Sequence, residues 1–252
     1  MVKFFVARRS CIEVHFATRS SNLSQNFHAK LICSCELLDF MTITWYGHSC
    51  FRLESKDASI LIDPFSPEVG LRPPKIKDDI VLVSHEHYDH NNTEGLPKDA
   101  LLIKGPGEYE VKGVFIKGIQ SFHDKSQGQE RGLNTIYAIK MEDLVIVHMG
   151  DFGQSALTEE QIEKIGEVDI LMIPTGGVYT INYKEAVEAI SQIEPKIAIP
   201  MHYKIPGLKV DIEGPEKFLK EMSLTPEKAE KSYKIQKKNL PVQELKLVMF
   251  QL

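Results

Sequence analysis

The sequence predicts an α/β (α+β) protein built as a four-layer αββα sandwich. Three observations lead to this fold class. Short strands follow one another from Met41, strands alternate with helices from residue 144 onward, and the 252 residues are 42% hydrophobic and 26% charged. A chain of this size and composition can bury one large core. Two β-rich halves would pack face to face, with helices on their outer faces.

The first half is expected to contain short strands separated by turns. Gly47, His48 and Ser49 form one such turn, and Lys56 and Asp57 form another. A short helix is expected at residues 92–95. The expected strands are Thr42–Trp45, Cys50–Leu53, Ser59–Asp63, Ile80–Val83, Leu101–Ile103, Val114–Ile119 and Thr135–Lys140.

The second half is expected to alternate strands and helices. Thr158 and Gln161 have the spacing of a capping box at the start of a helix. The expected helices are Glu159–Ile165, Tyr183–Gln192 and Pro215–Met222, and the expected strands are Leu144–Met149, Ile170–Ile173, Ile197–Pro200 and Glu244–Phe250.

Residues 1–40 differ from the rest of the chain. The segment Arg8–Asn26 is rich in arginine and serine, and the apolar patch Leu31–Cys33 is too short for a signal sequence or a membrane span. Because Met41 directly precedes the first clear strand, we predict that residues 1–40 form an extension outside the fold. Residues 41–252 are then a single domain.

Charge and cysteine usage limit the partners and the compartment. The formal net charge is −5 and the sequence pI is about 6.0, which gives no electrostatic signature of nucleic acid or membrane binding. The expected partner is a small-molecule substrate, and homo-oligomerisation stays open. Four cysteines without C-x-x-C spacing favour a reducing cytoplasm.

The strongest chemical signal lies directly after the apolar run 80–83. His85 and His87 are two residues apart, so they point to the same side of near-extended backbone. Asp89 and His90 follow where the chain must turn, and they can face a second position a few Å away. This spacing predicts two metal ions.

Three further candidate ligands each follow a predicted strand. They are His123, Asp151 and His202. Loops at one end of a layered sheet are where functional residues gather. A divalent ion binds imidazoles and carboxylates, and a carboxylate between two ions can bridge them, so Asp151 is the candidate bridge.

Some neighbouring residues have ordinary structural explanations. Asp124 competes with His123 as the ligand of its loop, and Asp151 could cap the segment after Gly150. His148 lies three positions before Asp151, so in extended backbone the two side chains point to opposite faces. His148 is therefore expected to be a core histidine.

Other residues are candidates for the surroundings of the site. His48 is either a contact to substrate or ligands, or a turn residue. Asp63 is either a hydrogen-bond acceptor for a ligand histidine or a turn cap. Tyr88, Tyr203 and the loop Gly176–Thr180 are candidates to line the pocket.

Together these motifs resemble the metallo-β-lactamase superfamily of metal-dependent hydrolases. The His-x-His-x-Asp-His signature is carried by residues 85–90, and the later family motifs are similar to His123, Asp151 and His202. Residues 45–50, 62–64 and 200–203 resemble the branch that includes ascorbate-6-phosphate lactonase. The resemblance implies one metal on His85, His87 and His123, and a second on Asp89, His90 and His202, with Asp151 shared.

The expected activity is hydrolysis of an ester, lactone or phosphoester bond by a metal-bound hydroxide in a binuclear site. Zinc is the expected metal, with manganese or iron as alternatives. Asp89 and His48 are the candidate catalytic residues. No phosphate-binding glycine loop or basic pocket stands out, because Lys and Arg are dispersed along the sequence.

Two other functions stay open. A nuclease or phosphodiesterase of the same superfamily would be expected to carry an RNA-binding insertion, and the intervals between the motifs are short. A non-catalytic metal-binding protein would tolerate the loss of ligands, and here every motif is present. A flavodiiron-type oxygen reductase is disfavoured, since His87 stands where that family pattern has glutamate.

Overall fold

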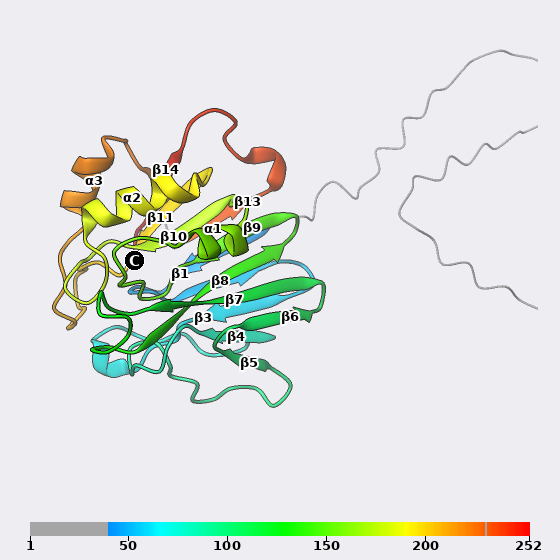
Figure 1. Ribbon diagram of the computed structural model, residues 1–252. Helices are drawn as coiled ribbons and strands as arrows, with labels where there is room; N and C mark the ends of the chain where they lie inside the picture. Colours follow the sequence, from blue (N-terminus) through cyan, green and yellow to red (C-terminus); the bar gives the residue numbers. More distant parts are fainter. Residues whose placement is uncertain (1–39, 230) are drawn as a thin grey trace, which may run out of the picture. The chain divides into compact units, whose positions relative to one another are not determined.

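The computed structural model describes residues 40–252 except residue 230, so all but the last residue of the predicted extension 1–40 lies outside the described part (Figure 1). Two β-sheets form the framework. The six-stranded sheet has the order β13-β1-β2-β3-β4-β5, with strands Met41–Trp45 (β1), Phe51–Glu54 (β2), Ser59–Ile62 (β3), Ile80–Val83 (β4), Leu101–Lys104 (β5) and Ser232–Ile235 (β13).

The eight-stranded sheet has the order β12-β14-β11-β10-β9-β8-β7-β6. Its strands are Gly107–Val111 (β6), Val114–Phe122 (β7), Leu133–Met141 (β8), Leu144–His148 (β9), Ile170–Pro174 (β10), Ile197–Met201 (β11), Glu227–Ala229 (β12) and Lys246–Phe250 (β14). The predicted mixed α/β fold with two sheets is therefore confirmed.

The division between the halves differs from the prediction. Strands β7 and β8 belong to the second sheet, because the chain crosses between sheets after β5 through Gly105, which has φ of +127°. The sequence also gave no sign of β6, where Glu108 and Glu110 are exposed and the other residues are only half-buried. Strand β13, from the C-terminal part, completes the first sheet.

The inner faces of the sheets enclose the main apolar core, which includes Phe51, Leu82, Tyr137 and Ile199. The outer face of the eight-stranded sheet packs against helices Glu159–Ile165 (α1), Tyr183–Ile193 (α2) and Glu216–Met222 (α3) (Figure 1). Thr158 and Gln161 form the predicted capping box of α1. The three predicted helices of the second half are thus present within one residue of their expected ends.

Loops rather than α-helices cover the outer face of the six-stranded sheet in the described part of the chain. Leu61 and Val81 pack there against Phe65, Val69 and Leu208, with the short 3₁₀ helix η2 (Pro67–Val69) at the centre. The helix predicted at residues 92–95 is absent, and that prediction is wrong. The Asn92 N–H instead donates to the Pro64 carbonyl over 2.8 Å, and its side-chain amide donates to the Phe65 carbonyl over 3.0 Å.

Strand direction brings three of the predicted ligands, His123, Asp151 and His202, to one edge of the eight-stranded sheet. Strands β9, β10 and β11 are parallel, and β7 runs in the same direction because β8 is antiparallel to both β7 and β9. The carboxyl ends of these strands therefore meet at the same edge. No helix in the described residues is long and apolar enough to cross a membrane.

Candidate metal centre

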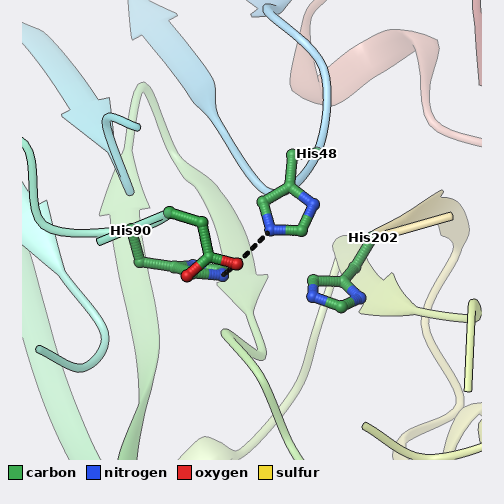
Figure 2. Close-up of side chains that lie close together, drawn as sticks. His48, His90 and His202 are labelled. Carbon is green, nitrogen blue, oxygen red and sulfur yellow. Dashed lines mark hydrogen bonds and ion pairs between the residues drawn. The ribbon is translucent and has the colours of Figure 1, made fainter. Parts of the chain in front are cut away.

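The seven predicted ligands and His48 converge at this edge. Their donor atoms form three groups, each within 4.8 Å: His85, His87 and His123; His85, His90 and Asp151; and His48, Asp89, His90 and His202. Figure 2 shows His48, His90 and His202 facing a common space from three different segments of the chain. The first and third groups match the two ligand sets implied by the family pattern, with His48 added to the second.

Asp151 lies between the groups and is 2% exposed. Its Oδ2 atom is 3.1 Å from His202 Nε2 and 3.3 Å from His123 Nε2, and its Oδ1 atom is 3.3 Å from His90 Nε2. The Asp151 N–H donates to Asn134 Oδ1 over 2.9 Å. This central position is the one expected of a bridging carboxylate.

Gly150 allows the chain to turn sharply into this position. Its φ is +57°, and a Cβ added to it would lie 2.3 Å from Asn134 Oδ1 and 2.7 Å from the Ser84 Cβ. An L side chain would therefore both strain the backbone and displace the residues on either side.

Several buried polar atoms at the centre have no hydrogen-bond partner. They are His85 Nε2, His90 Nε2, His202 Nε2 and Asp151 Oδ1. A buried polar atom without a partner costs about 1–3 kcal/mol, and proteins rarely leave several together. Imidazole nitrogens and a carboxylate oxygen that face one another are the donor set of a borderline divalent cation, so these residues fit a metal site.

Asp63 orients two of these histidines from behind. Its Oδ2 atom accepts from His90 Nδ1 over 2.9 Å and from the Ser84 hydroxyl over 2.7 Å. Because Ser84 donates its proton to Asp63, its oxygen accepts from His85 Nδ1, which is 2.9 Å away. In their neutral forms both rings therefore present the lone pair of Nε2 to the centre. Of the two alternatives for Asp63, the structure therefore shows the hydrogen bond to a candidate ligand histidine.

The electrostatics of the centre favour a cation. Burial disfavours a charged imidazole, but Asp151 and Asp63 raise the pKa of His90 well above its usual value. Burial likewise opposes charge on Asp151, but His202 and His90 lower the pKa of its carboxyl well below its usual range. Asp151 and Asp63 thus stabilise a positive charge on the His90 ring that lies between them. The same carboxylates also stabilise a metal cation bound at this centre.

His48 lies behind the centre, in the turn after β1. It is fully buried with φ of +54°, and its Nε2 is 3.1 Å from Asp89 Oδ2. Burial, with His202 beside it, lowers the pKa of His48 to about 4, so the ring is neutral at pH 7. Its carbonyl accepts from Trp45 Nε1 and from the His202 N–H. The residue therefore contacts the predicted ligands, and it does not line the pocket described below.

The structure also decides between the alternatives for Asp124 and His148. The Asp124 carboxylate accepts four backbone N–H groups of its own loop, from Ser126, Gly128, Glu130 and Arg131, so it is not available as a ligand. His148 Nε2 donates to the Ser49 carbonyl over 2.9 Å, and its Nδ1 accepts from the Gly150 N–H. His148 is the predicted core histidine.

A pocket of about 500 Å³ opens over the centre, a size that suits a small molecule. His87, Asp89 and Asp151 form part of its wall, and the predicted candidates Tyr88 and Tyr179 line it. Tyr203 does not line it, because this residue is 3% exposed and its ring packs 5.4 Å from that of Trp45.

Arg131 and Lys209 also line this pocket, and sequence reasoning missed both. Arg131 lies in a polar loop that resembles any solvated surface segment, whereas Lys209 lies between apolar residues of another loop. Neither position stands out as part of a site, and the two are 78 positions apart in the printed sequence. Basic residues are therefore dispersed along the sequence, as expected, but the fold brings two of them together at the pocket.

Comparison with known proteins agrees with this geometry. A family model described as a β-lactamase superfamily domain matches residues 42–202. A UPF0173 metal-dependent hydrolase of Methanopyrus kandleri is 30% identical over 214 residues, covering 72% of this chain and 91% of the relative. A UPF0173 protein of Pyrococcus furiosus is 34% identical over 203 residues, covering 72% and 90%.

A solved structure from Thermotoga maritima is also similar. It is assigned to the metallo-β-lactamase superfamily, is 35% identical to this chain, superposes with a TM-score of 0.68, and is matched over 84% of this chain and 100% of its own. The names of these relatives do not specify a substrate, so the resemblance to the ascorbate-6-phosphate lactonase branch stays a prediction. The chain belongs to the metallo-β-lactamase superfamily and is a metal-dependent hydrolase with a His/Asp cluster at the carboxyl ends of its strands.

Proposed function

We propose that the protein hydrolyses an ester, lactone or phosphoester bond of a small molecule at a binuclear zinc centre. The observation that carries this proposal is the set of unpartnered, buried imidazole nitrogens around Asp151. The similar Thermotoga maritima protein is described as a candidate zinc-dependent hydrolase. A cytoplasmic location stays a prediction from the cysteine pattern.

The two ligand groups define separate positions for two ions. His85, His87 and His123 would hold one ion, and Asp89, His90 and His202 the other, with Asp151 shared and His48 close to the second position. Ions bound there would supply Lewis acidity and a source of hydroxide at neutral pH. The pocket above the centre is large enough to admit a small substrate.

Asp89 is the candidate for moving or holding a proton at the pocket wall. Burial opposes its charge, but the hydrogen bond from His48 and the charge of His90 lower the pKa of Asp89 below its usual range. The carboxylate is therefore ionised at pH 7 and acts as a hydrogen-bond acceptor that orients the attacking water. His48 would serve as a positioning residue that acts through Asp89.

The first test is metal content, measured by elemental mass spectrometry on protein purified without chelator or a metal-affinity tag. We expect about two equivalents of one metal in the wild type, and a clear loss in Asp151→Ala and His87→Ala. Asp99→Ala, in an exposed loop, is the matched control and should keep the wild-type content.

Activity on esters, lactones and phosphodiesters is then measured with the same proteins. Both centre variants should lose turnover while still unfolding cooperatively. Wild-type protein that binds less than about half an equivalent of zinc, manganese or iron after reconstitution would contradict the binuclear centre and favour a scaffold role. Full turnover in both centre variants would contradict catalysis at this centre.

A further inference from the structure

The basic side chains around the pocket differ in their ion pairs. Lys125 pairs with Glu185, and Lys104 pairs with Glu86 at 3.1 Å, so acidic neighbours neutralise both ammonium groups. Arg131 approaches only Glu130, at 3.8 Å, which is too long for a hydrogen bond. Within the described part of the chain, Lys209 makes no ion pair and the Arg131 guanidinium makes no hydrogen bond. The two cations that line the pocket are thus less neutralised by acidic neighbours than Lys104 and Lys125 are.

Arg131 is held in place by its loop. The Asp124 carboxylate accepts four backbone N–H groups of residues 126–131, including that of Arg131 over 2.7 Å. The Arg131 guanidinium carbon lies 5.5 Å from the centre of the Tyr179 ring, within the range of a cation–π contact. Its side chain is 34% exposed, so the guanidinium is accessible from the pocket. An ordered loop and an aromatic support reduce the entropy lost when the guanidinium binds a ligand.

Lys209 is presented by a second anchored loop. Its backbone N–H donates to the Val69 carbonyl over 2.7 Å. Gly70, with φ of +92°, permits this approach, because a Cβ there would lie 2.2 Å from the Gly207 carbonyl oxygen and 2.9 Å from Lys209 Cγ. The stem of Lys209 is therefore packed against Gly70, while the residue as a whole is exposed.

We propose that Arg131 and Lys209 bind a carboxylate or phosphate group of the substrate, so that the enzyme prefers small organic anions to neutral compounds. This inference rests on the proposed function, since it assigns the substrate class of the same pocket. The guanidinium fork suits bidentate binding of either group, and the ammonium adds a second charge. The anionic group would be remote from the bond that is cleaved.

The remaining charges of the pocket are compatible with this binding mode. Asp89 and Asp151 face the metal positions, where bound cations offset their charge. Asp211 is the other acidic residue that lines the pocket, and it is exposed to solvent. Water screens an exposed carboxylate more effectively than it screens a half-buried guanidinium, so Asp211 weakens the attraction without cancelling it.

The hydrolytic test uses pairs of substrates that differ only in a remote carboxylate. The pairs are para-nitrophenyl hexanoate and the mono-para-nitrophenyl ester of adipate, butyrolactone and its carboxylated derivative, and the para-nitrophenyl phosphodiesters of ethanol and of glycolate. For the pair that is hydrolysed, we expect kcat/KM of the metal-loaded wild type to be about tenfold higher for the member that carries the additional carboxylate. Arg131→Gln and Lys209→Gln should each remove most of this preference, and Arg131→Glu should reverse it.

The matched controls are Arg72→Gln and Lys220→Gln, two exposed residues that do not line the pocket. Both should keep the wild-type preference. The Arg131 substitutions leave its backbone bond to Asp124 in place, so the loop is expected to stay folded, and thermal unfolding checks this. Equal kcat/KM within the hydrolysed pair, or an unchanged preference in folded Arg131→Gln and Lys209→Gln, would overturn the proposal.

A binding experiment tests the anion site formed by Arg131 and Lys209 independently of turnover. Calorimetry compares butyrate with the dicarboxylates succinate, glutarate and adipate, since one carboxylate can occupy the metal centre and the second can reach the two cations. We expect wild-type protein to bind the best dicarboxylate about tenfold more tightly than butyrate, and Arg131→Gln to lose most of this difference. If the protein shows this binding preference but hydrolyses none of the substrate pairs, the outcome would contradict the proposed reaction and support the anion site. Equal binding of all four acids by the wild type would overturn the anion site.

Discussion

Asp63 shows how one residue fixes several others. It is fully buried with φ of +47°, and its carboxylate accepts from the Ser84 N–H, the Ser84 hydroxyl and His90 Nδ1. Aspartate and asparagine tolerate this left-handed backbone better than most residues. The carboxylate adds acceptor capacity on both oxygens, which the amide of asparagine lacks.

Asp63→Asn is therefore expected to keep the backbone but weaken metal binding. The amide has one oxygen, so it cannot accept from Ser84 and His90 as the carboxylate does, and the rings of His85 and His90 lose their orientation. We expect metal affinity to fall about 10- to 100-fold, measured by competition with a chromophoric chelator. Asp99→Asn is the control. Unchanged affinity in a folded Asp63→Asn protein would show that Asp63 does not support the ligands.

At the scale of elements, the strands that carry the centre are fixed at their opposite end by Asp169, directly before β10. Its carboxylate accepts from the Val145 N–H over 2.9 Å, from Lys196 Nζ over 2.8 Å and from Lys237 Nζ over 2.6 Å. Burial opposes charge on Asp169, but the two lysines and the Val145 N–H lower the pKa of its carboxyl. One side chain thus links β9, β10, the start of β11 and the 3₁₀ helix Lys237–Asn239 (η3).

The stabilisation from Asp169 is expected to depend on pH. Because the folded-state pKa lies below the unfolded value of about 3.9, the contribution is fully present above that value and is lost as the pH falls through the folded pKa. We expect Asp169→Asn to lower the free energy of unfolding by about 1–2 kcal/mol at pH 7, with a smaller difference at pH 3. Urea denaturation at both pH values measures this change in the free energy of unfolding, and Asp99→Asn is the control. An equal difference at pH 7 and pH 3 would contradict the ionic contribution.

At the scale of the molecule, Tyr137 joins the two sheets beside the metal centre. It lies on β8 of the eight-stranded sheet, and its hydroxyl donates to the Val83 carbonyl at the end of β4 over 2.8 Å. The same oxygen accepts from the Gly105 N–H over 3.0 Å. Since Val83 directly precedes the segment 84–90, this contact links the start of that segment to the eight-stranded sheet.

Tyr137→Phe is expected to lower the free energy of unfolding by about 1–3 kcal/mol, because the Val83 carbonyl and the Gly105 N–H lose their partner in a largely buried site. Chemical denaturation checks this value. Tyr109→Phe is the control, since its hydroxyl makes only a long, exposed contact to the Pro106 carbonyl, at 3.4 Å. Equal stability of the two variants would show that the Tyr137 hydroxyl contributes nothing to the junction of the sheets.

Much of the fold could be predicted from local patterns, because the patterns reflect local physics. The run Ile80–Val83 is buried on both faces and forms β4, and Thr158 and Gln161 cap α1 as their spacing predicts. The prediction failed where non-local contacts decide the conformation. A short helix is predicted at residues 92–95, but hydrogen bonds from Asn92 to Pro64 and Phe65 hold the start of this segment in a different conformation.

The sequence by itself determined the family and the set of candidate ligands, since a short run such as 85–90 carries its spacing in any fold. Tertiary structure alone decided that Asp124 organises its loop rather than binding metal, that His48 lies behind Asp89, and that Arg131 and Lys209 share one pocket. The reason is physical. Spacing along the chain fixes contacts within a few residues, whereas the contacts of a lone charged side chain depend on which distant loops the two sheets bring together.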